Sequence, residues 1–362
     1  MASRFQKKTA PKLPSIPGTK PSLFNFQLLT SSGVPGLDQL FGGGLPLGTL
    51  LLLEDLPIEH EENIETGQNY SSLLCQYFLS EGVVHGHKLY LSQVPPGGMQ
   101  LPAIVQNEEK SGDQSQGADE KMKIAWRYEG QAPTSEELNN KSRTHHFNLN
   151  KVVPDDQVSN LLHKFILEPR VEVNESRYND LYNDLKKSLQ DFAINPKVPA
   201  TNILRIGITE LGNCLYDSSS EHHENEVNFL KFLYKLRALA RSHLTVIVLT
   251  ISQDFFAKHE PNEHFHIQVK EMVDFVIDLT TFSKAKRQNG LFKDYHGLME
   301  LSKAAPLNCL VNSSNHNHIR SKYLFKSLRT KFSISPMHLP PDLGGDADEI
   351  KKATNSMNKL EF

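Results

Sequence analysis

Short apolar runs separated by amphipathic segments recur along most of this chain. An apolar run bounded by glycines or turns is typical of a strand buried on both faces, whereas apolar residues three and four positions apart predict a helix. Alternation of the two predicts an α/β fold with a mainly parallel sheet and right-handed connections. The expected strands lie at Thr49–Leu53, His87–Ser92, Ile203–Ile208, Leu244–Ile251 and Val273–Leu279, with an edge strand at Phe24–Leu29 and a late strand at Gly297–Leu301.

Helical spacing of apolar residues predicts the segments between these strands. One helix is expected over 71–80 and is stopped by Gly82, and longer ones are expected over 178–192 and 226–240. A further apolar stripe predicts a helix that ends at Pro169; its members are Val158, Leu161, Leu162 and Phe165.

The stretch from Thr30 to Leu53 organises the chain. Gly33 marks a turn, Leu37 to Phe41 gives one apolar helical face, and Gly42 to Gly44 stops that helix. The order Ser-Gly-x-x-x-Leu-Asp, Gly-Gly-Gly-Leu-Pro-x-Gly and apolar strand resembles the entry to the nucleotide-binding core of RecA and KaiC-type ATPases. In those proteins the strand runs into a phosphate-binding loop, G-x-x-x-x-G-K-[ST].

The phosphate-binding lysine is missing here. Several carboxylates follow Leu53, and no lysine or arginine occurs from Pro21 to His87. A carboxylate about 4 Å from a phosphate oxygen is repelled by roughly 4 kcal/mol at an effective dielectric constant of 20. We therefore expect a RecA-like ATPase fold with a degenerate phosphate-binding loop. One hypothesis is that a carboxylate occupies the positive N-terminal end of the next helix; the alternative is an acidic, solvated loop without a role.

Composition limits the classes of function. The chain has 362 residues, 38% of them hydrophobic, and a net charge of −3, so a large domain with polar loops is expected and any nucleic-acid contact must rest on a local basic patch. Cys75, Cys214 and Cys309 are far apart, which argues against a disulfide framework or a zinc site and favours a reducing compartment. No long apolar run predicts a membrane span, and we expect a soluble intracellular protein.

Shifts in composition predict the domain boundaries. Residues 1–20 read as a disordered basic tail, either solubilising or an arm that contacts RNA or directs nuclear import. Residues 21–341 form the expected RecA-like domain, with a flexible polar insertion at about 100–120, and residues 342–362 form a flexible C-terminal tail. Trp126 lies after the insertion beside two cations; it either stacks a base or, as we favour, anchors the insertion on its domain or on a partner.

Several separated motifs give a second resemblance. Ile124-Ala125-Trp126-Arg127-Tyr128, the degenerate RecA-like entry, Leu339-Pro340-Pro341 and the terminal Leu-Glu-Phe together resemble the PAXNEB family, the fourth subunits of Elongator complexes. The resemblance runs from about Leu28 to Phe362 apart from the insertion. It implies a heterohexameric ring with the fifth and sixth Elongator subunits, which docks on the catalytic subassembly and binds tRNA during wobble-uridine modification, in the cytoplasm and the nucleus.

The same resemblance implies an accessory subunit rather than an enzyme, with no catalytic residue, no metal and no cofactor of its own. Glu210 follows the strand that would end in the acid of an active ATPase, and it is a weak candidate for nucleotide binding. The alternative is a working ring ATPase with ATP bound between subunits, where a neighbour supplies the missing cation and turnover regulates tRNA binding and release. A third interpretation is a monomeric scaffold without RNA affinity.

Candidate RNA-binding residues come from two basic clusters. The first is Lys284, Lys286, Arg287 and Lys293; the second is Arg320, Lys322, Lys326, Arg329 and Lys331. The paired histidines are expected to be exposed loop residues, because none has the spacing of a known metal motif. These pairs are His145-His146, His222-His223, His264-x-His266 and His316-x-His318.

Overall fold

A computed structural model describes the chain over residues 16–22, 25–56, 69–94, 98–105, 145–167, 176–194, 201–216, 222–251, 255, 263–283, 287–288, 292–306 and 321–337. Several features expected from the sequence lie outside these residues. They are most of the basic tail, the insertion from 106 onward with Trp126, the C-terminal tail, Lys284, Lys286, Arg320, Cys309 and the Leu339-Pro340-Pro341 motif.

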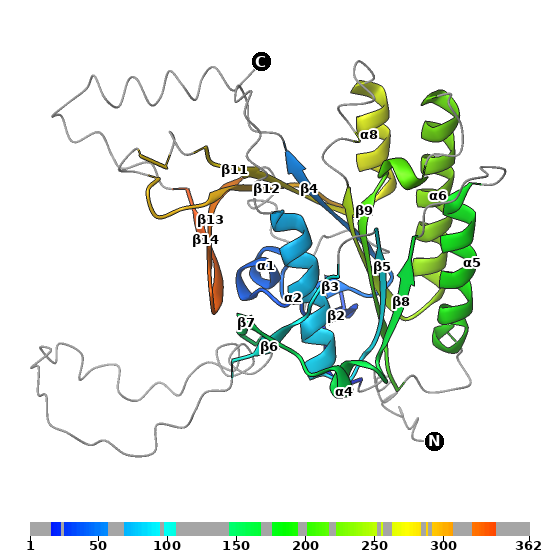
Figure 1. The fold of residues 1–362 in the computed structure, drawn as a ribbon, viewed down its shortest axis with the longest axis horizontal. Coiled ribbons are helices and arrows are strands. Elements are labelled where there is room, and N and C mark those ends of the chain that lie inside the picture. The colour runs from blue at the N-terminus through cyan, green and yellow to red at the C-terminus, as the bar shows by residue number, and fades with distance from the viewer. Residues whose placement is uncertain are drawn as a thin grey trace, which may run out of the picture.

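A large sheet lies at the centre of the described structure (Figure 1). In chain order its strands are β4 (Leu50–Leu56), β5 (Lys88–Gln93), β8 (Leu162–Ile166), β9 (Leu204–Leu211), β10 (Thr245–Ile251), β11 (Phe275–Thr281), β12 (Gly297–Ala304), β13 (Lys322–Leu328) and β14 (Lys331–Pro336). Their spatial order is β14-β13-β12-β11-β4-β10-β9-β5-β8. The strands from β11 to β8 pair in parallel, and β12 to β14 extend the β11 edge as an antiparallel meander.

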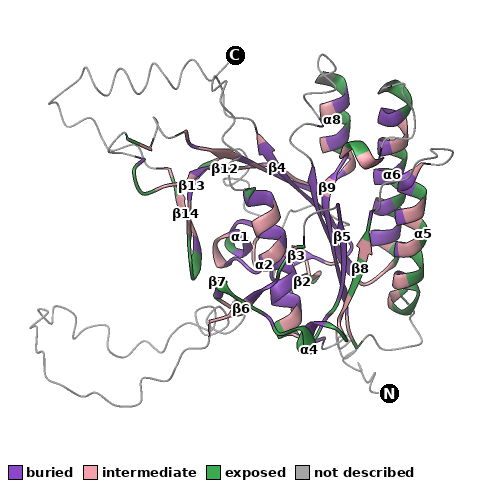
Figure 2. Ribbon diagram, in the orientation of Figure 1, coloured by how far each residue is buried: buried purple, intermediate pink, exposed green. Residues whose placement is uncertain are grey.

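Helices cover both faces of this sheet. On one face lie α1 (Pro35–Leu40) and α2 (Tyr70–Val84); on the other lie α5 (Arg177–Leu189), α6 (His222–Ser242) and α8 (Glu263–Met272) (Figure 1). The helices turn their buried sides to the sheet (Figure 2). β4 serves both layers, because Leu51 and Leu53 belong to the core under α2 whereas Leu50 and Leu52 belong to the core under α5, α6 and α8. The sequence prediction of a strand buried on both faces is confirmed.

Two small sheets flank the large one. The first contains β1 (Thr19–Pro21), β2 (Leu28–Thr30) and β3 (Leu45–Pro46), and the second contains β6 (Pro102–Ile104) and β7 (Phe147–Val152), with α4 (Asp155–Val158) after it. Short 3₁₀ turns, η1 (Gln190–Phe192) and η2 (Cys214–Tyr216), complete the regular elements of the described residues. None of the helices described is long and apolar enough to cross a membrane.

The entry segment, the glycine-rich stretch that begins at Thr30, packs against α2. The Asp38 carboxylate accepts the Ser31 hydroxyl at 2.6 Å and both the backbone N–H and the hydroxyl of Ser32 at 2.7 Å. Gly33 has φ +85°, and a Cβ there would lie 2.3 Å from the carbonyl oxygen of Tyr77 in α2. The segment therefore lies directly against the backbone of α2, where a larger residue cannot fit.

The helix predicted from the stripe between Val158 and Phe165 is wrong. Val158 ends the short helix α4, and Leu162 to Ile166 form β8, which pairs in parallel with β5. The stripe spans two elements, and strand pairing at the edge of the sheet overrides the local helical spacing. Pairing with β5 is a tertiary contact, and the local spacing of apolar residues cannot predict it.

Four expected boundaries also differ from the structure. Ile16 is buried and Lys20 pairs with Leu29 in the first small sheet, so the expected tail at 1–20 is too long. Residues 102–104 form β6 inside the expected insertion, and the edge strand expected at Phe24–Leu29 starts only at Leu28. α2 passes through Gly82 and ends at Val84, before Gly86 at φ +68°.

Candidate functional site

A carboxylate occupies the N-terminal end of α2. β4 carries Asp55 to this end, where its Oδ2 and Oδ1 accept the backbone N–H of Ser71 at 3.2 and 3.3 Å. Asn69 caps the same helix, because its Oδ1 accepts the backbone N–H of Ser72 at 3.3 Å and the Ser71 hydroxyl at 2.7 Å. The first N–H groups of the helix are thus bound by side chains of the chain itself. The hypothesis of an internal carboxylate at this helix end is confirmed.

Burial determines the electrostatics of Asp55. Burial raises the pKa of Asp55 above 3.8, the hydrogen bonds from Ser71 and Tyr70 oppose the shift, and the negative charge of Glu54 adds to it. A phosphate at this position would meet that carboxylate with no lysine or arginine from the segment 21–87 to offset it. The arrangement disfavours binding of a nucleotide phosphate at the end of α2.

Glu54, the neighbour of Asp55 on β4, points to the opposite layer. Its carboxylate lies 2.8 Å from His266 Nε2 and 3.1 Å from Lys270 Nζ, both on α8, and Lys270 also pairs with Asp278 at 2.9 Å. Burial by itself raises the pKa of Glu54, but the hydrogen bond from His266 and the charge of Lys270 outweigh it and hold the pKa below 4.5. These contacts join α8 to β4 and β11, and His266 is therefore not the free loop histidine that its spacing suggested.

Glu210 lies near the carboxyl end of β9 in a left-handed backbone conformation, with φ +52°. Its backbone N–H donates to the Thr250 hydroxyl of β10 at 3.0 Å. Burial raises the pKa of its carboxyl above 4.5, against a hydrogen bond with Asn213. No described hydrogen bond or ion pair joins Glu210 to Asp55, so the structure leaves the two acids as separate features of the same sheet edge.

The described part of the first basic cluster consists of Arg287 and Lys293. Arg287 is partly buried, and its Nε donates to the carbonyl oxygen of Phe282 at 3.2 Å, whereas Lys293 is exposed. The positive charge of Arg287 contributes, after burial, to a lowered pKa of His296. The cluster follows β11, at the junction with the antiparallel part of the sheet.

The second cluster lies on the hairpin of β13 and β14. Lys322, Arg329 and Lys331 are exposed, and Lys326 is partly buried and pairs with Asp294 at 3.6 Å. Both clusters therefore belong to the β11 side of the sheet, far along the strand order from β8.

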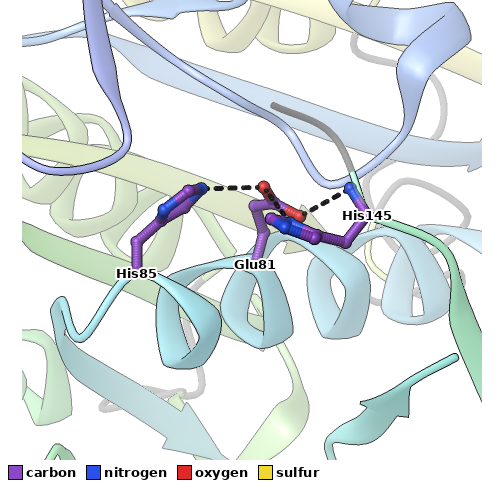
Figure 3. A group of neighbouring side chains, drawn as sticks. All are labelled: Glu81, His85 and His145. Atoms are coloured by element: carbon purple, nitrogen blue, oxygen red, sulfur yellow. Dashed lines mark hydrogen bonds and ion pairs between the residues drawn. The ribbon is translucent and has the colours of Figure 1, made fainter. Parts of the chain in front are cut away.

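A further group of residues was missed by sequence reasoning. Glu81 and His85 lie one turn apart near the C-terminal end of α2, and His145 reaches them from the chain that leads into β7 (Figure 3). The Glu-x-x-x-His spacing in a helix was a local signal, but nothing in the sequence joins His145 to it. His145, expected to be an exposed loop residue, is instead partly buried against Glu81.

One carboxylate oxygen of Glu81 interacts with a nitrogen of both imidazoles. Its Oε1 lies 3.0 Å from His85 Nε2 and 3.1 Å from His145 Nδ1. Burial by itself raises the pKa of Glu81, but the hydrogen bonds from His145 and His85 outweigh it and lower the pKa to about 2. Glu81 is therefore an ionised, fully buried carboxylate in this fold.

Arg205 is a fully buried residue of β9 that interacts electrostatically with Glu81. Its guanidinium donates to the carbonyl oxygens of Ser31 and Phe78 at 2.8 Å, to Thr30 Oγ1 at 2.7 Å and to His87 Nδ1 at 3.0 Å. Arg205 thus joins the central sheet to the entry segment and to α2.

Comparison of the sequence with known proteins shows the family of this chain. A family model described as PAXNEB protein matches residues 12–362. The chain belongs to the PAXNEB family. Members that resemble it include proteins named Elongator complex protein 4 from Xenopus laevis, 35% identical over 96% of this chain and 88% of that one, and from Homo sapiens, 33% identical over 95% and 84%. The namesake from Schizosaccharomyces pombe is 24% identical over 98% and 96%.

Among solved structures, the KaiC-like protein PH0186 from Pyrococcus horikoshii OT3 is similar over 85% of this chain and 99% of that chain, with 13% identity and a TM-score of 0.46. The strand order and the helix layers of this PAXNEB chain confirm the expected α/β class: its central strands are parallel and helices cover both faces of the sheet.

Proposed function

We propose that this PAXNEB chain is a non-catalytic subunit of an Elongator complex, and that it forms a heterohexameric ring with the fifth and sixth subunits. The ring binds tRNA during wobble-uridine modification and docks on the catalytic subassembly, in the cytoplasm and the nucleus. The observation that carries the proposal is similarity over nearly the whole chain to relatives named Elongator complex protein 4.

The occupied end of α2 supports an accessory role. An ATPase of this fold class holds nucleotide phosphates with backbone N–H groups and a lysine at such a helix end. Here Asp55 accepts the N–H of Ser71, and no lysine or arginine occurs nearby in the sequence. This contact supports a subunit that holds no nucleotide phosphate at the end of α2.

The basic clusters support a contact with tRNA. Phosphate contacts require lysine or arginine on the surface, and Lys293, Lys322, Arg329 and Lys331 are exposed. We assign the first contact to the cluster of Lys284, Lys286, Arg287 and Lys293, which follows β11, and give Trp126 the role of an anchor on a partner.

The test is tRNA binding by the ring reconstituted with candidate fifth and sixth subunits. A Lys284, Lys286 and Arg287 triple glutamate variant should weaken binding more than about tenfold and reduce the salt dependence by about one unit of slope per lost phosphate contact. A matched control reverses three exposed lysines on the α5 and α6 layer, namely Lys186, Lys187 and Lys231. The control should leave binding unchanged, and sizing should show both variant rings intact.

Unchanged binding by the first variant contradicts the assignment. A Lys322, Arg329 and Lys331 triple glutamate variant then decides whether the hairpin binds tRNA. If neither cluster matters, the chain is an architectural subunit and the RNA is held by its partners. A chain that stays monomeric with every candidate partner contradicts the ring itself.

A second function, a ring ATPase with ATP between subunits, is favoured by one observation. Glu210 is held in a left-handed conformation at a strand end, a kind of backbone strain that occurs at functional sites. In this function Glu210 positions the nucleotide, and a neighbouring subunit supplies the cation that binds its phosphates. Glu210→Gln should then abolish ATP turnover by the purified ring, and the ring should still bind tRNA in the absence of ATP. Equal turnover by the variant and the parent ring excludes this role of Glu210.

A further inference from the structure

The cluster of Glu81, His85 and His145 lies at the opposite end of α2 from Asp55, and the proposed RNA and nucleotide roles make no use of it. The last turn of α2 supplies Glu81 and its C-cap supplies His85, four positions later and on the same side of the helix. His145 lies just before β7, in the chain that leads into the second small sheet. Figure 3 shows the two imidazoles beside the carboxylate. Their nitrogens and the carboxylate oxygen all lie within 4.8 Å of one another.

We propose that Glu81, His85 and His145 bind a divalent transition-metal ion, with Zn²⁺ the best match. Two imidazole nitrogens and one carboxylate oxygen are a donor set that zinc accepts, with a water molecule as fourth ligand. Tetrahedral bonds of about 2.0–2.1 Å place neighbouring donor atoms roughly 3.3–3.4 Å apart. The distances from Glu81 Oε1 to His85 Nε2 and His145 Nδ1 are 3.0 and 3.1 Å, within a few tenths of an ångström of this spacing, and all three donor atoms lie within 4.8 Å of one another.

The surrounding charges favour a cation. Two buried carboxylates, Glu81 and Asp38, interact with the fully buried guanidinium of Arg205. The hydrogen bonds of Arg205 to Ser31 and Phe78 go to carbonyl oxygens. Around the cluster these buried groups therefore offer two carboxylates and one guanidinium, a setting that suits a cation better than an anion.

Neighbouring groups define the ligand set. His87 lies close to His85, with ring centroids 5.5 Å apart, but its Nδ1 accepts from Arg205 and its Nε2 donates to the carbonyl oxygen of Pro17 at 2.8 Å. His87 therefore has no nitrogen left for a metal. The side chains of His85 and His145 are 18% and 27% exposed, which gives an ion and its water access from solvent.

The ion would act as a cross-link. His145 is the residue at which the described chain resumes before β7, whereas Glu81 belongs to α2 and His85 caps the C-terminal end of that helix. A shared ion joins these two parts, and it holds the small sheet of β6 and β7 on the helix more firmly than hydrogen bonds to one carboxylate do.

The test is Co²⁺ and Zn²⁺ binding by the metal-free full-length chain. We expect one Co²⁺ per chain with the intense visible absorption of a tetrahedral N/O site, its displacement by Zn²⁺, and a higher melting temperature with Zn²⁺. His145→Ala should weaken binding by at least about 100-fold and abolish the shift in melting temperature. His163→Ala is the matched control, since His163 also pairs with a carboxylate, Asp184 at 2.9 Å, but with no second imidazole described at that carboxylate.

Other outcomes overturn the proposal. Equal Co²⁺ binding by the His145→Ala and His163→Ala variants means that the chain, which has 16 histidines, binds metal nonspecifically on its surface. No binding by the parent chain means that the cluster is an ion pair only. Circular dichroism of the metal-free variants checks that they fold, and His85→Ala provides a second test should His145→Ala fail to do so.

Discussion

The Asp55 carboxylate accepts the backbone N–H of Ser71 at 3.2 Å, and it thereby binds the end of α2 where a RecA-like ATPase holds phosphate. The contact joins the carboxyl end of the central strand β4 to the first turn of the helix. An anion within the chain thus satisfies a helix end that would otherwise attract an anion from solution.

Substitution of Asp55 by asparagine should change the pH dependence of stability. The pKa of Asp55 is raised above 3.8 in the folded chain, chiefly by burial, so the folded state holds this proton more tightly than the unfolded state does. Stability therefore falls as pH rises from about 3.8 through the folded pKa, and the full cost is present above it. Asp55→Asn keeps an oxygen for Ser71 and removes this cost.

The measurement is urea unfolding of the two proteins between pH 3 and 8. We expect the variant to match the parent at the acidic end and to become the more stable of the two as pH rises. Asp156→Asn, at an exposed position, serves as the control and should show no such divergence. A constant difference across the whole range would contradict the raised pKa of Asp55.

Close packing of the entry segment on α2 predicts unequal costs for two glycine substitutions. Gly33→Ala meets both an unfavourable φ of +85° and the Tyr77 carbonyl at 2.3 Å, whereas Gly86→Ala has a φ of +68° and no atom within 4 Å. The free energy of unfolding should fall by about 1–2 kcal/mol in Gly86→Ala and by about 3 kcal/mol or more in Gly33→Ala. Similar losses in denaturant titrations would show that backbone strain alone acts at Gly33.

The buried guanidinium of Arg205 should not be replaceable by lysine. Arg205→Lys keeps the charge but cannot reach Thr30, Ser31, Phe78 and His87 together, so buried acceptors lose their donors. We expect a loss of about 3 kcal/mol in thermal or urea unfolding. Arg329→Lys, at an exposed position between β13 and β14, should cost less than about 1 kcal/mol. Equal losses would mean that the charge, rather than the fork of donors, matters at Arg205.

Local pattern was sufficient for much of this fold because the information was local. The run of leucines in β4 predicted a strand covered on both sides. The acidic residues after Leu53, with no nearby cation, left two hypotheses open, and the structure supports the one that places a carboxylate at the end of α2. The Glu81 cluster could not be predicted from the sequence, because His145 and Glu81 are 64 positions apart and only the fold brings them together. The same limit explains β8, where pairing with β5 decides the conformation of Leu162 to Ile166.

Backbone strain at Glu210 gives a final prediction. A non-glycine residue in the left-handed region costs about 1–2 kcal/mol, and glycine relieves that cost while losing roughly 0.5–1 kcal/mol of chain entropy. Glu210→Gly should therefore leave the free energy of unfolding unchanged or raise it slightly, even though the hydrogen bond with Asn213 is lost. Glu210→Val should lose about 1–2 kcal/mol, since a β-branched residue tolerates this conformation poorly. If urea titrations show Glu210→Gly to be less stable than the parent chain, the glutamate side chain stabilises the fold by more than the strain costs, and strain at this strand end no longer argues for a role in nucleotide turnover.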